Sequence, residues 1–206
     1  MKKIHPSRYD FDDHLMISKV GFIRQLRELD ESQYQLLIKQ TRLVELDQGE
    51  KLLEEGSSSQ EFFALLRGKL DVYEGENQLG HVSAGQLIGV FSLINETVRS
   101  ASLIASGING ARVLGINYSM FGKAQDFSTF NLITKLCLYR EMERYTRWKL
   151  DEYVRLSDDE SMLEELDNLH SYLGERSTLE ELYFLEERIV YLSSLFSTMN
   201  EASNKA

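Results

Sequence analysis

Glycine is distributed very unevenly along this chain of 206 residues. Eleven of the 13 glycines fall between Gly49 and Gly122, and only Gly174 occurs later. Glycines between short apolar runs are typical of strands joined by tight turns, whereas a long stretch with almost no glycine and no proline favours helices. We therefore expect two regions that meet near residue 125: a strand-rich domain over 1–125 and a helical region over 126–206.

Short apolar runs in the first region predict strands. They read RLVEL, EFFALLRG, KLDVYEG, SASLIASG and ARVLGI, and each is bounded by Gly, Ser or Asn. In KLDVY, Leu70 and Val72 alternate with Asp71 and Tyr73, which is the period of two of a half-buried strand. Several short strands at close spacing favour a sandwich or a roll. We predict an α+β fold: an antiparallel, jelly-roll-like β-roll with flanking short helices, followed by an all-helical C-terminal region.

Two short helices are predicted ahead of the strands. The first has one apolar face, and the second has an apolar face preceded by Asp30, with Gln33 three residues later as a capping pair. The faces consist of Phe22, Ile23, Leu26 and Leu29 in the first helix, and of Tyr34, Leu37 and Ile38 in the second.

The sequence pattern of the C-terminal region predicts three helices. A long helix of about seven turns begins after Asp126, because apolar residues recur at steps of three and four. These residues are Leu132, Ile133, Leu136, Tyr139, Met142, Tyr145 and Trp148. A second helix is predicted over MLEELDNLHSYL, with Gly174 as its C-cap. Ser177 or Thr178, with Glu180 or Glu181 three residues later, then opens the last helix.

The last helix carries a heptad seam of apolar residues. The seam consists of Leu182, Leu185, Ile189, Leu192, Phe196 and Met199. It fits either an amphipathic helix that packs on its own protein or an intermolecular coiled coil. Because the apolar face of the long helix also exceeds what a small roll can cover, we expect a homodimer.

Charge and cysteine content narrow the function classes. The net charge of −10 opposes attraction to nucleic acid and to anionic membrane. Cys137 is the single cysteine, and neither a signal-peptide pattern nor an apolar run long enough to span a bilayer occurs, so we expect a cytoplasmic protein without membrane partners.

The stretch from Gly49 to Gly68 carries a family resemblance. It reads GEKLLEEGSSSQEFFALLRG and is followed by KLDVY, LGHVSAGQLIGVFSLINETVRSASLIAS and ARVLGI. Over about residues 20–125 the chain resembles the cyclic nucleotide-binding domain family of catabolite-activator-like β-rolls. In that family, these glycines and apolar strands precede a phosphate-binding cassette. Glu55, Gly56 and Gly68 are expected to shape turns.

The resemblance places the cassette between Gly89 and Ala101. Arg99 follows Gly89 by ten residues, and Ser100 and Ala101 come next, as the family pattern expects. The resemblance implies that the Arg99 guanidinium and the Ser100 hydroxyl bind a cyclic phosphate, while Gly89 lets the backbone approach the ligand. Taken alone, Arg99 is also compatible with a surface arginine at the start of a strand.

Val90 departs from the family pattern. There the family has a glutamate that accepts a hydrogen bond from the ribose hydroxyl, and valine accepts none; an unpaired buried hydroxyl costs about 1–3 kcal/mol. The cassette is therefore degenerate, and three interpretations remain. The domain binds cAMP or cGMP weakly, binds another small anion or apolar ligand, or has lost ligand binding and serves as an interaction scaffold.

Many bacterial proteins with this domain are transcription regulators that have a helix-turn-helix after the long helix. No such element is recognisable here, because residues 156–187 contain eleven acidic residues against one basic residue, Arg176. This balance opposes binding among phosphates, so we expect no DNA partner. A basic cluster on the long helix is predicted to be a solvated face because acidic residues are interleaved with it. It consists of Lys135, Arg140, Arg144, Arg147 and Lys149.

No pattern for catalysis or metal binding is found in the sequence. The four histidines, His5, His14, His81 and His170, have no metal-ligand spacing, and no P-loop, nucleophile-elbow or dinucleotide motif occurs. The acidic run of Asp158, Asp159 and Glu160 lacks the ligand spacing of a calcium loop and favours a solvated helix start.

We therefore predict a non-catalytic regulatory protein that acts through protein–protein interaction, with its acidic helical tail facing a partner with a basic surface. The alternative is a genuine sensor of a cyclic nucleotide or another small anion at Gly89, Arg99 and Ser100. The two differ at Arg99: a sensor needs a vacant pocket there, whereas in a scaffold Val90, Phe91 or the long helix fills it.

Overall fold

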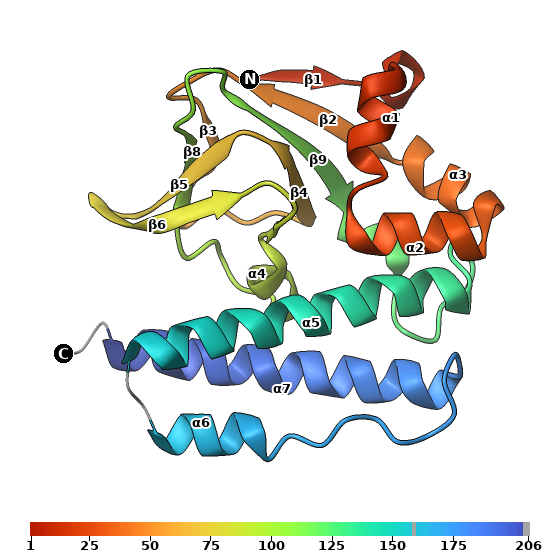
Figure 1. The fold of residues 1–206 in the computed structure, drawn as a ribbon, viewed down its shortest axis with the longest axis vertical. Helices are drawn as coiled ribbons and strands as arrows, with labels where there is room; N and C mark the ends of the chain where they lie inside the picture. The colour runs from red at the N-terminus through yellow and green to blue at the C-terminus, as the bar shows by residue number, and fades with distance from the viewer. Residues whose placement is uncertain (158–159, 204–206) are drawn as a thin grey trace.

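The computed structural model describes residues 1–157 and 160–203, and its strands form two antiparallel sheets. The strands are β1 (Lys2–Ile4), β2 (Thr41–Leu46), β3 (Lys51–Leu53), β4 (Glu61–Arg67), β5 (Lys69–Glu74), β6 (Asn77–Ser83), β7 (Leu87–Ile88), β8 (Ser102–Ala105) and β9 (Ala111–Asn117). One sheet has the order β1-β2-β9-β4-β7 and the other the order β3-β8-β5-β6. Together they make the β-roll that the sequence predicts (Figure 1).

Helices flank the roll and form the C-terminal region. They are α1 (Phe11–Ile17), α2 (Gly21–Leu29), α3 (Glu31–Lys39), α4 (Val90–Ile94), α5 (Leu132–Ser157), α6 (Glu160–Asp167) and α7 (Leu179–Ser203), with short 3₁₀ turns at Pro6–Arg8 and Tyr118–Phe121. The predicted fold class is confirmed.

Apart from its edge strand β1, the sheet β1-β2-β9-β4-β7 is buried on both faces. On β2, Leu43 faces the cluster formed with the helices, whereas Val44 faces the interior of the roll. Phe62 and Phe63 divide in the same way on β4. Successive side chains of a strand point to opposite faces, so a strand buried on both sides is apolar throughout. This explains why EFFALLR shows no alternation.

The N-terminal helices α2 and α3 form where the sequence predicts them. The Asp30 carboxylate accepts a hydrogen bond from the Gln33 amide at 3.0 Å, which confirms the predicted cap. Leu29 is an exception to the predicted apolar face, since it is exposed. The sequence analysis missed β1 and α1. Asp13 of α1 is buried in a 2.6 Å ion pair with Arg112 of β9, which attaches α1 to the roll.

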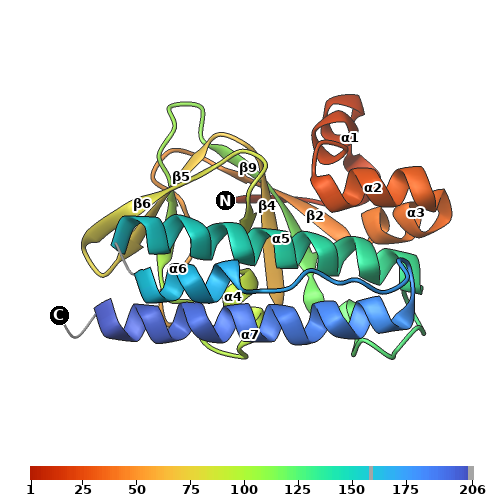
Figure 2. The ribbon, with the colours of Figure 1, turned by 60° about the horizontal axis from the view of Figure 1, so that its bottom comes forward.

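The three C-terminal helices lie alongside one another below the roll (Figure 2). Helix α7 runs in the same direction as α5, so the chain must return along the bundle between them. The predicted second helix over MLEELDNLHSYL is wrong in its second half, because α6 ends at Asp167. A helix rises about 1.5 Å per residue and an extended chain about 3.3 Å, so an extended segment after Asp167 covers the return distance with fewer residues.

Two arginines hold this extended segment in place. The Arg147 guanidinium donates to the Leu166 carbonyl at 3.4 Å, and the Arg188 guanidinium donates to the His170 carbonyl. The Leu166 carbonyl lies in the last turn of α6, where it also accepts from the Leu169 amide at 3.3 Å, and the His170 carbonyl lies beyond the end of the helix. Gly174 is therefore not the C-cap of a helix.

The heptad seam of α7 packs within the chain itself. Leu182, Leu185 and Ile189 are buried in the main core, and Leu192 joins a smaller cluster with Leu150 of α5. The side chain of Met199 lies outside the described residues. Of the two interpretations of the seam, this structure shows the amphipathic helix on its own protein.

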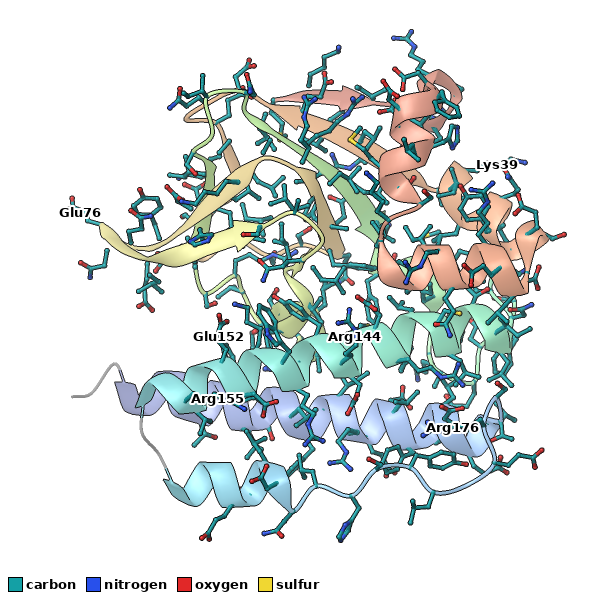
Figure 3. All side chains as sticks on the ribbon, viewed as in Figure 1. Lys39, Glu76, Arg144, Glu152, Arg155 and Arg176 are labelled. Atoms are coloured by element: carbon teal, nitrogen blue, oxygen red, sulfur yellow. The ribbon has the colours of Figure 1, made fainter. Side chains whose placement is uncertain are left out.

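The predicted solvated face on α5 is wrong for two of its members. Lys135 is fully buried, and Arg140 pairs with the buried Glu181 at 2.7 Å. Arg144 does lie at the surface, Lys149 is half-buried, and each pairs with a carboxylate on its own helix. Figure 3 labels Arg144 on α5.

Lys135 joins the roll to the helical bundle. Its ammonium donates hydrogen bonds to the carbonyls of Lys123 and Ala124 and lies 5.0 Å from the centre of the Phe127 ring. Burial lowers the pKa of Lys135, while the charges of Asp126 and Glu186 oppose that shift. The ammonium thus satisfies two carbonyls of the turn that leads into α5.

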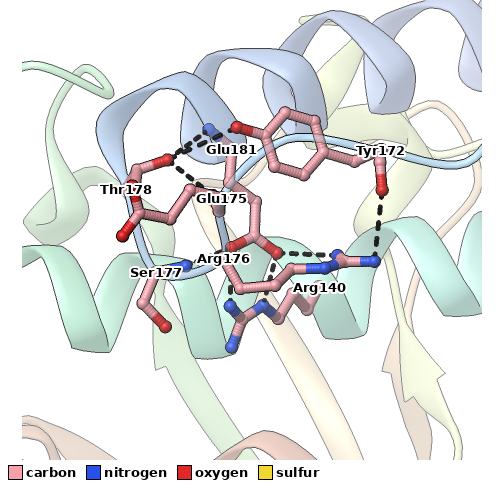
Figure 4. Close-up of polar contacts among 7 residues, drawn as sticks. All are labelled: Arg140, Tyr172, Glu175, Arg176, Ser177, Thr178 and Glu181. Atoms are coloured by element: carbon pink, nitrogen blue, oxygen red, sulfur yellow. Dashed lines mark hydrogen bonds and ion pairs between the residues drawn. The ribbon is translucent and has the colours of Figure 1, made fainter.

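A polar cluster fastens the start of α7 to α5 (Figure 4). The fully buried Glu181 carboxylate accepts hydrogen bonds from Arg140 at 2.7 and 3.0 Å, from Arg176 at 3.0 Å and from the Ser177 amide at 2.6 Å. Thr178 caps α7, as predicted, by accepting from the Glu181 amide at 3.2 Å. Burial by itself raises the pKa of Glu181, but these hydrogen bonds together lower it to about 2.

We expect Glu181→Gln to remove a pH-dependent part of the stability. Because the folded pKa lies below the ordinary value, the carboxylate stabilises the fold at neutral pH, and this contribution is lost as the pH falls through about 2. The variant should lose about 2–3 kcal/mol at pH 7 and little at the acid end. Urea unfolding between pH 7 and pH 2 measures this. The exposed neighbour Glu180→Gln is the control, and equal losses in the two variants would contradict the assignment.

Candidate functional site

The cassette begins where β7 passes into α4. Gly89 lies between the two elements with φ +78°, a left-handed conformation that favours glycine. A Cβ atom at this position would overlap the guanidinium of Arg99. The sequence analysis assigned Gly89 to close approach of a ligand; in this structure the group that approaches is a side chain of the protein.

Arg99 is buried, with 3% of its surface exposed, and its guanidinium points back into the protein. Its Nη1 donates to the Gly89 carbonyl at 2.6 Å and to the Ser92 hydroxyl at 2.5 Å, and its Nη2 donates to the Glu61 carbonyl. The interpretation of Arg99 as a surface arginine is wrong. The guanidinium links the cassette to the first residue of β4.

Among the residues that the structure describes, no carboxylate forms an ion pair with Arg99. Burial lowers the pKa of Arg99, and the nearby charge of Glu61 opposes this shift. The buried Nε atom of Arg99 has no hydrogen-bond partner. The Glu61 carboxylate itself is occupied by Arg42, at 2.8 and 2.5 Å. Arg99 is thus a buried cation satisfied mainly by uncharged oxygens.

The remaining predicted site residues are not assembled around Arg99. Val90 is the first residue of α4 and is fully buried in the core shared by sheet and helices. Ser100 is exposed, and Ala101 is half-buried. Within the described part of the chain, the Ser100 hydroxyl makes no hydrogen bond, so the structure joins the Arg99 guanidinium to Gly89 but not to the Ser100 hydroxyl.

Two oxygen acceptors of Arg99 escaped the sequence analysis. The Ser92 hydroxyl is one, and a serine within the apolar run LIGVFSLI is a signal that could have indicated it. The Glu61 carbonyl is the other. Every residue type has this atom, so no sequence signal exists for it.

The two clefts described on the surface do not include Arg99. One, of about 470 Å³, lies at the turns after β4 and β8 and is lined by Arg67, Gly68, Lys69 and residues 107–110. The other, of about 450 Å³, lies at the mouth of the roll and is lined by the Arg42–Glu61 pair, Phe63 and neighbouring residues. Arg99 borders the second cleft, because its guanidinium donates to the Glu61 carbonyl and its amide donates to the Ser57 carbonyl at 2.8 Å.

No group of three or more His, Cys, Asp or Glu side chains is placed to hold a metal ion in the residues that the structure describes. Asp158 and Asp159 of the acidic run lie outside those residues. Cys137 is buried on α5, where burial raises the pKa of its thiol to about 11. Among the described helices, none is long and apolar enough to cross a membrane.

Comparison with known proteins identifies the roll. Residues 43–124 match the family model described as "Cyclic nucleotide-binding domain". This segment belongs to that family. A cGMP-dependent protein kinase of Eimeria tenella is 31% identical over 97 residues, which are 47% of this chain and 10% of the kinase. The chain therefore spans about a tenth of that curated relative.

Solved structures of low sequence identity share the fold. The cAMP-bound protein PfPKA-R superposes with a TM-score of 0.51 at 18% identity, over 77% of this chain and 49% of that chain. A protein of Geobacter metallireducens GS-15 superposes with a TM-score of 0.50 at 17% identity, over 65% of this chain and 96% of that chain. That protein is named for cyclic nucleotide binding.

We expect Arg99 to be a major stabilising residue of this cyclic nucleotide-binding domain. Arg99→Ala leaves two carbonyls and a hydroxyl without their donor and should cost about 2–4 kcal/mol. Arg24→Ala, at an exposed arginine of α2, should stay within about 0.5 kcal/mol of the unchanged chain. Urea unfolding measures both. An Arg99→Ala cost as small as that of the control would mean that the guanidinium is not held as described.

Proposed function

We propose that this chain is a non-catalytic regulatory protein whose cyclic nucleotide-binding domain works without a ligand. In this proposal, the roll and its helical bundle form one scaffold that acts through protein–protein contact. The observation that carries the proposal is the position of Arg99. The cation that the family resemblance assigns to the cyclic phosphate is buried against Gly89, Ser92 and Glu61 of its own chain.

Val90 supports the same proposal. It occupies the position at which the resemblance expects a glutamate for the ribose hydroxyl, and its side chain is fully buried in the core. A nucleotide entering beside it would have to separate packed apolar side chains and would find no acceptor there. The degenerate cassette thus serves packing rather than recognition.

The helical region supplies the proposed contact surface. Between residues 164 and 187, six acidic residues are exposed, namely Glu164, Glu165, Asp167, Glu175, Glu180 and Glu187. A partner with a basic surface would be attracted to them, and its binding should weaken as salt is added. The same negative charge underlies our predictions that the chain does not bind DNA or an anionic membrane. The prediction of a cytoplasmic protein rests instead on the single cysteine and the lack of a signal-peptide pattern.

A cyclic nucleotide sensor is the second candidate function. It is favoured by the family match and by the interval of ten residues between Gly89 and Arg99. In this alternative, cAMP or cGMP displaces the Gly89 carbonyl and the Ser92 hydroxyl from the guanidinium and engages Ser100. Another small anion could be recognised by the same groups.

The homodimer stays a prediction. Tyr139 and Met142, which suggested an uncovered face on α5, are buried within the chain, whereas Trp148 is 40% exposed. A dimer would therefore use surfaces other than the α7 seam. Light scattering at micromolar concentration tests it, and a monomer there would exclude it.

We expect no saturable heat when the intact chain is titrated with cAMP or cGMP up to millimolar concentration, because displacing Arg99 costs the three hydrogen bonds that it makes. Isothermal titration is the measurement, with thermal unfolding in the presence of each nucleotide as a second readout.

The matched variant is Arg99→Lys, which keeps the charge and loses the planar fork of donors. Saturable binding by the unchanged chain that weakens at least about tenfold in Arg99→Lys would establish the sensor instead. Binding that is equal in the two proteins would place a ligand elsewhere in the domain and would also overturn the ligand-free proposal.

A further inference from the structure

Helix α4 of the cassette is enclosed between the roll and the helical bundle. Val90 and Leu93 are buried in the core, and Ser92 binds Arg99. Phe91 and Asn95, one turn apart, contact α5 and α7 instead. In Figure 1, α4 lies just above α5 on the side that faces the roll. One face of this short helix therefore contacts Arg99 and the core, and the other face contacts the helical bundle.

An aromatic stack joins α4 to the C-terminal half of α7. The rings of Phe91 and Phe196 are 4.2 Å apart between centres with an angle of 15° between their planes. Phe91 also contacts Tyr145 of α5, and the centres of these two rings are 6.0 Å apart. Aromatic pairs of this geometry add to the stabilisation that burial provides. Phe91 thus fills a position shared by α5 and α7.

A polar contact fixes the same two helices. The Asn95 side-chain amide donates to the Ser197 hydroxyl at 2.9 Å and to the Ser193 carbonyl at 3.4 Å. Ser197 and Phe196 are adjacent on α7, so one turn of α7 supplies both the ring and the acceptors. Phe91 and Asn95 of α4 are therefore matched by a helix that carries an aromatic residue next to a hydroxyl residue.

The two ends of α7 are held to different extents. At its start, Glu181 is fastened by Arg140, Arg176 and the Ser177 amide. Toward its C-terminal end, among the side chains that the structure describes, α7 shares with α5 and α6 a cluster of four buried apolar residues, Leu150, Val154, Leu166 and Leu192, with Leu169, Leu195 and Phe196 packed against it.

Two unpaired hydroxyls also lie in this half of the bundle. Thr146 on α5 and Ser193 on α7 are fully buried, and neither Oγ atom has a hydrogen-bond partner. A buried hydroxyl without a partner weakens the packing that contains it. Among the described side chains, these two hydroxyls therefore weaken the packing of the C-terminal half of α7.

We propose that the groove between α4 and α5 is a helix-binding site, which the C-terminal half of α7 occupies as a displaceable clamp. The partner that fits the groove is an amphipathic helix presenting an aromatic and a neighbouring hydroxyl residue, as α7 does at Phe196 and Ser197. Its binding lifts this half of α7 while the Glu181 cluster retains the other half. The inference deepens the proposed protein-contact function by naming one contact site, but its geometry does not require that the domain be ligand-free.

Hydrogen exchange of the intact chain tests the clamp. Phe196→Ala should accelerate exchange of residues 90–97 and 190–198 by about tenfold, because it removes the stack that holds α4 against α7. Phe184→Ala is the matched control, since Phe184 is also a half-buried aromatic residue of α7 but packs 5.2 Å from Tyr172, away from α4. The control should leave exchange of residues 90–97 unchanged. Unchanged exchange of these residues in Phe196→Ala, or equal acceleration in both variants, would overturn the clamp.

Binding in trans tests the groove. A synthetic peptide of residues 179–199 should bind the Phe196→Ala chain, since its intact Phe196 ring can replace the weakened internal helix. The unchanged chain should not bind it, because the covalently linked α7 competes at high effective concentration. The same peptide carrying Phe196→Ala should not bind either chain. Failure of the unmodified peptide to bind the Phe196→Ala chain would overturn the helix-binding site.

Neither experiment contains a nucleotide, so the two proposals fail separately. Nucleotide binding by the unchanged chain would overturn the ligand-free function and leave the clamp standing. Unchanged exchange in the cassette would overturn the clamp and leave the ligand-free function standing.

Discussion

The double burial of the sheet β1-β2-β9-β4-β7 is the constraint on which the rest of the structure depends. One face closes the interior of the roll, and the other supports α2, α5 and α7 through side chains such as Leu43 and Phe62. A sheet with two apolar faces must be covered on both sides. The helical region is thus the second cover of this sheet, and the cassette, which leaves the sheet at β7, is necessarily enclosed between the two covers.

Two buried cations hold the junctions of this arrangement. Arg99 joins the cassette to β4, and Lys135 joins the turn after the roll to the start of α5. Both donate mainly to backbone carbonyls, and burial lowers the pKa of each. Turn and loop carbonyls without partners are expensive inside a protein, and a long cationic side chain can reach several of them at once. In this chain, the Arg99 cation of the family motif therefore donates hydrogen bonds to the backbone of its own protein.

The success of sequence reasoning differed between the elements. The strands β2, β4, β5, β8 and β9 were found because alternation and glycine-bounded runs are local signals, whereas the short strands β3 and β7 and the exposed strand β6 were missed. The Asp30 and Thr178 caps were found because capping needs only neighbouring residues. The extended segment after Asp167 was missed because its conformation depends on a distance in space. That distance is the return path from the end of α5 to the start of α7. Helix α1 was missed because its anchor, the Asp13–Arg112 pair, joins residues that are far apart in the chain.

The sequence by itself determined the family resemblance of the roll, the succession of a strand-rich region and a helical region, and the interval that places Gly89 ten residues before Arg99, since all of these follow from local patterns. The tertiary structure decided what Arg99 touches and which helix covers α4. The partners of Arg99 include the carbonyls of Gly89 and Glu61, atoms that every residue carries, and Phe91 meets Phe196 across more than a hundred residues of chain. Contacts of these kinds leave no local signal, because they exist only once the sheet has been covered on both faces.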